Sequence, residues 1–97
     1  MNSMEQRKKI DERKSNLEKR FLHLFDYLEV NGKSCFRKEN GVIFSLTKIP
    51  GELALVVEYA VSYEEAILYR FEDGDRFYLE DMDEDTMFQA MLREIGQ

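Results

Sequence analysis

Apolar residues in the first thirty positions recur at the spacing of a helix. The same stretch has no proline or glycine and is rich in glutamate, lysine, arginine and leucine, which favours helix. The pattern predicts one long helix from Met4 to about Val30, and Gly32 could end it by adopting a positive φ. The stripe expected to face a core consists of Ile10, Leu17, Phe21, Leu24 and Leu28.

The two halves of this predicted helix differ in composition. Residues 17–30 carry enough apolar positions to pack on a core. Residues 5–16 offer only Ile10, and Lys14 interrupts the apolar stripe. We therefore expect the first part, residues 1–16, to project, to fray, or to pack against another molecule.

The middle of the chain shows the two-residue alternation of half-buried strands. Residues 33–38 and 42–48 flank Asn40-Gly41, which predicts a two-residue type I′ hairpin turn. A further strand, residues 53–61, follows the sequence Ile-Pro-Gly-Glu at 49–52, which predicts a type II turn. Because such short connections cannot make the crossovers that parallel strands need, the sheet is expected to be an antiparallel meander.

Residues 62–71 admit two interpretations. Ser62 and Glu65 have the spacing of a capping box, which would begin a short helix. Residues 66–71, however, are β-branched and aromatic and alternate like a strand. Asp73-Gly74 would then form a second type I′ turn before a strand at 75–80. We favour the strand pair over the helix.

The C-terminal pattern is the least ambiguous part of the sequence. Asp83 can cap a helix, and two more carboxylates follow in the first turn, where the helix dipole favours anions. Met82 and Met87 have the spacing of a hydrophobic staple, and Gly96 would end the helix. The expected buried stripe is Met87, Phe88, Met91, Leu92 and Ile95.

Together these elements predict a single α+β domain over residues 1–97. It would have a long N-terminal helix, an antiparallel β-meander of four to five strands and a short C-terminal helix. A chain of 97 residues is long enough to bury a core without disulfides or metals. The second face of the sheet would carry several apolar positions, so either the two helices sandwich the sheet or this face is left for a partner.

Charge is unevenly distributed along the chain. Residues 1–20 carry seven Lys/Arg and four Asp/Glu, whereas residues 21–97 carry seven and sixteen. The overall net charge of −6 makes nucleic acid an unlikely partner, because phosphate contacts need an excess of lysine and arginine. Acidity is densest over residues 72–85, which hold eight carboxylates and one cation, Arg76.

The sequence favours a soluble cytoplasmic protein without a membrane partner. Cys35 is the only cysteine, so it cannot form an intramolecular disulfide, and a lone thiol suits a reducing compartment. The N-terminus has no apolar core of a signal peptide. No apolar run approaches the roughly 18 residues that a membrane-spanning helix needs.

The inventory of catalytic groups is poor, so we do not expect an enzyme, a cofactor or a metal. His23 is the only histidine, and Cys35 has no base near it in sequence. Glycine-rich phosphate loops and zinc or nucleophile motifs are absent from the sequence. The acidic run beginning at Asp81 resembles half of a calcium loop, but Thr86 and Leu92 occupy the positions that need Gly and Glu.

By elimination, the sequence predicts a small non-enzymatic protein-interaction module: a regulator, an inhibitor or a chaperone-like protein. Its binding surface would be an acidic hairpin together with the start of the last helix, facing a basic protein. The candidate acidic residues are Glu72, Asp73, Asp75, Glu80, Asp81 and Asp83. The candidate aromatic anchors are Tyr69, Phe77 and Tyr78.

Three alternatives stay open at this point. The chain could be a homo-oligomeric structural or accessory protein, forming a dimer through the N-terminal helix or the semi-apolar sheet face. It could mimic nucleic acid and inhibit a DNA-binding protein, with carboxylates in place of phosphates. It could also be a divalent-dependent enzyme, because the oxygen ligands of Asp73, Asp75, Asp81 and Asp83 suit Mg²⁺ or Ca²⁺.

Overall fold

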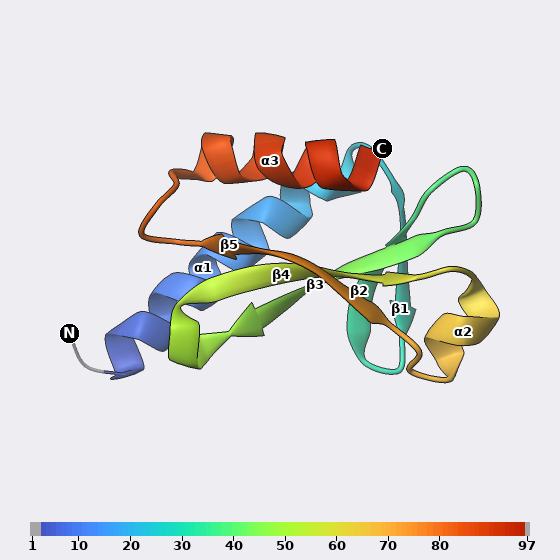
Figure 1. Ribbon diagram of the computed structural model, residues 1–97, viewed down its shortest axis with the longest axis horizontal. Coiled ribbons are helices and arrows are strands. Elements are labelled where there is room, and N and C mark those ends of the chain that lie inside the picture. The colour runs from blue at the N-terminus through green and yellow to red at the C-terminus, as the bar shows by residue number, and fades with distance from the viewer. Residues whose placement is uncertain (1–2, 97) are drawn as a thin grey trace.

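The computed structural model describes residues 3–96, and their side chains from Met4 onward (Figure 1). It confirms the predicted α+β class, with a helix at each end and a five-stranded antiparallel sheet between them. The elements are α1 (Ser3–Leu22), β1 (Asp26–Val30), β2 (Lys33–Arg37), β3 (Ile43–Ile49), the 3-10 turn η1 (Pro50–Glu52), β4 (Ala54–Ala60), α2 (Tyr63–Ile67), β5 (Glu72–Tyr78) and α3 (Glu84–Gly96).

The sheet is a meander in which each strand pairs with its neighbours in sequence, in the order β1-β2-β3-β4-β5. One row of paired residues, Phe36, Phe44 and Tyr59, runs across three strands on the first face. The adjacent row, Cys35, Ser45 and Glu58, lies on the second face because side chains alternate along a strand. The first face is therefore apolar at its centre, and the second is mixed.

Both long helices cover the first face of the sheet. The ribbon shows α1 crossing behind the sheet and α3 running along the β5 side (Figure 1), and α1 contacts β3, β4 and α3. Phe21 of α1 lies at the centre of this core, with its ring centroid 5.1 Å from that of Phe88 and 5.6 Å from that of Phe44. The main core includes Ile10, Leu17, Phe21, Phe36, Phe44, Leu55, Val57, Phe77, Met87, Met91 and Ile95.

A smaller core lies on the second face, under α2. It contains Val30, Cys35, Ile43, Ala60 and Ala66. Of the two arrangements expected from sequence, neither occurs in full. The long helices do not sandwich the sheet, and the second face is neither bare nor wholly covered.

The N-terminal helix is shorter than predicted, because residues 26–30 form strand β1 rather than its last turns. Asn31 (φ 52°) and Gly32 (φ 82°) form the two-residue turn between β1 and β2, so they are not a helix stop. Pairing with β2 sets Leu28 opposite Cys35, and Val30 is buried, whereas a continued helix would leave the edge of β2 that faces away from β3 unpaired.

The first half of α1 lies against the sheet rather than projecting from it. Ile10 is 1% exposed and belongs to the main core. Near it, Asp11 Oδ1 accepts a hydrogen bond from Lys48 Nζ of β3 at 2.7 Å. The expectation for residues 1–16 also covers residues 1 and 2, which lie outside the described part of the chain.

Two predicted turns have a different geometry. Between β2 and β3, Lys38 N donates to Val42 O at 2.8 Å, and Gly41 has φ 89° while Asn40 does not have positive φ. The loop therefore holds three residues, 39–41, instead of the predicted two, and only one of them has a positive φ. At 50–52 the chain forms a 3-10 turn instead of the predicted type II turn. The type II turn would have placed a positive φ at Gly51, but the positive φ is at Leu53 (φ 51°).

The prediction of a strand at 66–71 is wrong, because residues 63–67 form α2. Ser62 Oγ accepts a hydrogen bond from Glu65 N at 3.2 Å, so the capping signal prevails over the alternating pattern. Asp73-Gly74 is not a hairpin turn either, since both residues belong to β5. Gly74 is required for close packing, because a Cβ there would lie 2.7 Å from Val57 O.

The C-terminal helix forms as predicted. Asp83 Oδ1 accepts a hydrogen bond from Thr86 N at 2.8 Å, which caps α3. Met82 packs against the main core that contains Met87, as a hydrophobic staple requires. Met87, Phe88, Met91 and Ile95 are buried and Leu92 is half-buried.

Candidate functional site

The predicted acidic residues do not form one surface. Glu72 and Asp73 begin β5, whereas Glu80, Asp81 and Asp83 follow its end and lead into α3. A seven-residue strand spans roughly 20 Å at about 3.3 Å per residue, so β5 holds the two groups apart. All five side chains are exposed. The predicted hairpin turn at Asp73-Gly74 is absent, because both residues lie inside the strand.

The acidic group at the start of α3 contacts the basic helix α1. Arg20 forms an ion pair with Asp85 at 2.5 Å, and Arg13 Nη1 donates to Met82 O at 3.0 Å. The pKa of Asp83 is lowered by the hydrogen bonds from Thr86, and the charge of Arg13 adds to this effect. The opposite charges of the two chain ends therefore partly offset each other in the fold.

The middle of β5 is also engaged in internal contacts. Asp75 N donates a hydrogen bond to Glu94 Oε1 of α3 at 2.8 Å, and Arg76 pairs with Glu52 of the 3-10 turn. Burial raises the pKa of the Tyr59 hydroxyl, and the neighbouring Glu94 carboxylate raises it further. The contact of Asp75 with Glu94 ties α3 to the sheet, and that of Arg76 with Glu52 ties β5 to the 3-10 turn.

The three predicted aromatic anchors are not brought together. Phe77 is 5% exposed and belongs to the main core, so it is unavailable to a partner in this fold. Tyr78 ends β5, at the strand end away from α2, and is partly exposed. Tyr69 is well exposed beside α2, and its hydroxyl donates to Asn31 O at 2.8 Å.

The most conspicuous exposed apolar region lies on and around α2, and sequence reasoning missed it. Five large hydrophobic side chains within nine consecutive residues are between 44% and 69% exposed. We call them the α2 surface: Val61, Tyr63, Ile67, Leu68 and Tyr69. The sequence did hold a signal, because a helix begun at Ser62 could direct only the small Ala66 inward. Assigning residues 66–71 to a strand hid that signal.

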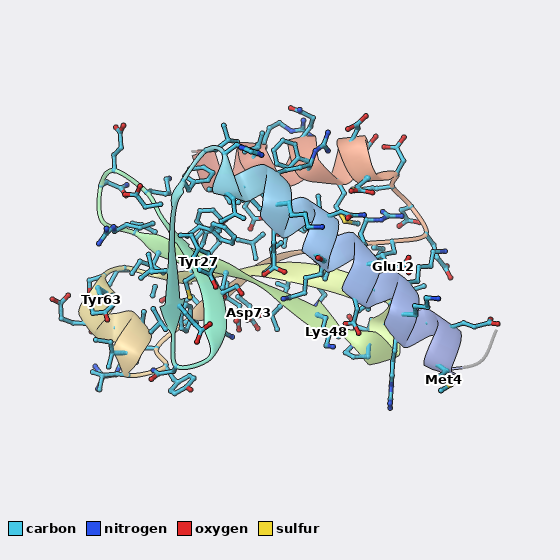
Figure 2. All side chains as sticks on the ribbon, turned by 180° about the vertical axis from the view of Figure 1, so that it is seen from behind. Met4, Glu12, Tyr27, Lys48, Tyr63 and Asp73 are labelled. Carbon is cyan, nitrogen blue, oxygen red and sulfur yellow. The ribbon has the colours of Figure 1, made fainter. Side chains whose placement is uncertain are left out.

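Two hydrogen bonds with Asn31 hold α2 in place. Asn31 Nδ2, in the turn between β1 and β2, donates to Ile67 O at 2.7 Å, and the Tyr69 hydroxyl donates back to Asn31 O. Arg70 and Glu65 form an ion pair at 3.4 Å. Ala66 is the one residue of α2 that is buried, so the helix contributes little to the core. Figure 2 shows Tyr63 of α2 at the end of the molecule opposite Met4.

A pocket of about 330 Å³ opens beside the α2 surface. It lies where the end of β4, the residues after α2 and the start of β5 meet. Its lining combines apolar and charged side chains from Tyr59, Val61, Glu65, Arg70, Phe71 and Glu72. Glu72 is thus the predicted acidic residue that lines the pocket beside the α2 surface.

A larger groove of about 630 Å³ runs between the α1–β1 loop and the β2–β3 loop. Its cations are already engaged: Lys38 Nζ donates to Ile95 O at the C-terminal end of α3 at 2.5 Å, and Arg37 lies 3.8 Å from Asp26. A lysine at that position interacts favourably with the helix dipole, so its role is explained by the fold.

On the second sheet face, a half-buried polar network lies next to the smaller core. Glu58 Oε1 accepts hydrogen bonds from Lys33 Nζ and Thr47 Oγ1, each at 2.5 Å. Burial acts to raise the pKa of Glu58, but the hydrogen bonds from Lys33 and Thr47, together with the charge of Lys33 and a contact with Asp73, lower it overall. Lys33 Nζ also lies 5.1 Å from the centroid of the Phe71 ring.

His23 and Cys35, the two residues considered for catalysis, differ in exposure to solvent. His23 is exposed just after α1, and Cys35 is fully buried in the smaller core under α2. Burial raises the pKa of the Cys35 thiol, which the charge of Lys33 only partly opposes. Within residues 3–96, no group of three or more His, Cys, Asp or Glu side chains is arranged to hold a metal ion.

Comparison with protein-family models, with curated proteins and with solved structures finds no match to this chain. Over the described range, no helix combines the length and the apolar character needed to cross a membrane.

Proposed function

We propose that this chain is a cytoplasmic, non-enzymatic protein-interaction module that binds a partner protein through the α2 surface. One observation carries the proposal. Five large hydrophobic side chains are exposed together on a segment that the fold holds in place but scarcely uses for its own core. Exposed apolar side chains gathered on one short segment are typical of interaction sites, whereas single scattered ones need no explanation.

The composition of the surface supports a binding role. Two of its five side chains are tyrosines, Tyr63 and Tyr69, which combine a large apolar area with a hydroxyl. Tyrosine is enriched among the residues that dominate binding energy at interfaces. Since Asn31 and Ser62 fix α2 by hydrogen bonds, binding would require little ordering of this segment.

Part of the acidic segment fits the same proposal. Glu64 of α2 and Glu72 of β5 are exposed beside the apolar side chains, which favours a partner with lysine or arginine around an apolar patch. Glu80, Asp81 and Asp83, at the other end of β5, are not part of the proposed surface. The partner would therefore be basic only where it faces α2.

The test is capture of a partner from the cells that produce the protein, comparing three forms. These are the wild type, the double variant Ile67→Ser/Leu68→Ser, and the control Leu22→Ser/Leu24→Ser. The control removes two exposed leucines that are 48% and 54% exposed near the end of α1. The captured protein is then purified, and its dissociation constant for each form is measured by calorimetry.

We expect the α2 double variant to weaken binding at least about tenfold, because buried apolar anchors each contribute over about 1 kcal/mol at an interface. The control should bind like the wild type. Equal affinity of the α2 variant and the wild type would contradict the proposed function.

A further inference from the structure

The pocket beside α2 pairs an apolar wall with carboxylates, and this combination is specific in what it can accept. Val61 is 69% exposed and Phe71 is half-buried, and both line the pocket together with Tyr59, Glu65, Arg70 and Glu72. The lining therefore has two carboxylates and one cation, a net charge of −1. We propose that this pocket receives an arginine side chain of the partner protein. The proposal rests on the proposed function, because it takes the α2 surface as the docking face.

The apolar wall suits the stem of a long cationic side chain. The three methylenes of arginine could lie along Val61 and Phe71 while the charged head stays near solvent. Phe71 already has a cation near its ring, since Lys33 Nζ lies 5.1 Å from the ring centroid. The methylenes of the arginine, rather than its guanidinium group, would therefore contact this ring, because the guanidinium group and Lys33 repel each other.

The carboxylates suit the planar guanidinium group of arginine, which can donate two hydrogen bonds at once. Glu72 is exposed at the start of β5 and lines the pocket. Glu65 pairs with Arg70 at 3.4 Å through one oxygen, Oε2, which is longer than the 2.7–2.9 Å typical of a strong charged hydrogen bond. Guanidinium can bridge two acceptors in a fixed plane, whereas an ammonium acts as a point charge, so arginine is favoured over lysine.

Net charge disfavours the simplest competing occupant, a second copy of the chain meeting the same surface. Residues 61–73 carry four carboxylates, Glu64, Glu65, Glu72 and Asp73, and one cation, Arg70. A two-fold dimer through this surface would bring these like charges together. A cationic side chain from a different protein reduces the same charge.

The experiment is an NMR titration of the ¹⁵N-labelled full chain with N-acetyl-arginine amide. N-acetyl-citrulline amide, which has nearly the same shape without the charge, is the matched ligand control. We expect saturable shifts confined to the amides of residues 59–61 and 70–72, with a dissociation constant on the order of millimolar for so small a ligand. The citrulline compound should cause no saturable shift.

Two variants locate the site and separate it from general attraction to an acidic protein. Glu72→Gln and Asp81→Gln make the same change in net charge, one in the pocket and one at the start of α3. Glu72→Gln should weaken binding about tenfold or more, and Asp81→Gln should leave it unchanged. Equal weakening by both variants, shifts spread over all acidic segments, or equal binding of the citrulline compound would overturn the proposal.

The outcome for the arginine pocket can be told apart from the outcome for the proposed function. If the captured partner loses affinity for Ile67→Ser/Leu68→Ser but not for Glu72→Gln, the α2 surface binds the partner and the arginine proposal is wrong. If the arginine compound binds at Glu72 but the captured partner is insensitive to the α2 variant, the proposed docking face is wrong.

Discussion

The helices α2 and α3 begin alike and are used differently. Each follows a capping side chain, Ser62 or Asp83, and each has two carboxylates in its first turn. However, α3 runs for thirteen residues and buries four of them, whereas α2 runs for five and buries only Ala66. The large apolar residues of α3 face the sheet, while those on and beside α2 face solvent.

The comparison shows which of the two helices has apolar side chains that the core does not use. The carboxylates at the start of α3 contact α1, and its apolar face completes the main core, so little of α3 is left for a partner. At α2, hydrogen bonds with the side chain and the backbone carbonyl of Asn31 replace apolar contacts as the means of attachment. The side chains that would otherwise anchor the helix remain free to bind.

The largest expected difference between the two helices is in stability. Met91→Ala removes a fully buried side chain from α3 and should lower the free energy of unfolding by about 2–5 kcal/mol. Leu68→Ala, at the C-terminal end of α2, should change it by less than about 0.5 kcal/mol, because that leucine is 58% exposed. Urea unfolding followed by circular dichroism measures both. A loss of more than about 1.5 kcal/mol for Leu68→Ala would mean that the α2 surface is structural.

The same contrast explains how much of the fold the sequence could predict. At α3 the cap, the staple and the apolar stripe all indicate one helix, and the prediction is confirmed. At residues 26–30, Leu28 continues the apolar stripe of α1, but Leu28 and Val30 also have the spacing of residues on one face of a strand, so the local pattern alone could not decide between helix and strand. Residues 26–30 form strand β1 because they pair with residues 33–37. This pairing involves another segment of the chain, so the local pattern does not reveal it.

The candidate site was predicted less well than the fold. Composition identified the acidic residues, but their positions depended on whether Asp73-Gly74 was a turn or part of a strand. Glycine there serves the close approach of β5 to β4 and α3, which no local signal distinguishes from a turn. The α2 surface was missed for a related reason: exposure depends on what packs nearby, and apolar residues in a sequence are expected to be buried.

A smaller effect is expected where α3 contacts the sheet through Gly74. A Cβ at this position would lie 2.7 Å from Val57 O and 2.9 Å from Tyr59 Cε2, and closer still to Glu94 Oε1. Gly74→Ala should therefore destabilise the fold by about 1–3 kcal/mol in urea unfolding. Gly51→Ala is the matched control, because nothing lies within 4 Å of a Cβ there. Similar unfolding midpoints for the two variants would show that α3 does not depend on this approach.

The smallest expected effect is on how stability depends on pH at the two helix caps. Asp83 can be protonated, whereas Ser62 cannot. Hydrogen bonds from Thr86 lower the pKa of Asp83, so its charged form is favoured in the folded state. Its contribution is complete at neutral pH, above the ordinary aspartate pKa of about 4, and is lost as pH falls through the lower folded value. Asp83→Asn retains a capping side chain without a charge.

In urea unfolding between pH 7 and pH 3, the wild type should exceed Asp83→Asn in stability at neutral pH. The advantage should shrink below about pH 4, as the aspartate becomes protonated first in the unfolded state and then, at lower pH, in the folded state. Glu58, whose pKa is also lowered, titrates in both proteins, so its effect cancels in the difference. Amide exchange at Glu65, which Ser62 caps, should show no such variant-dependent change. A constant difference across this range would indicate that the charge of Asp83 does not support α3, and the two caps would then be equivalent.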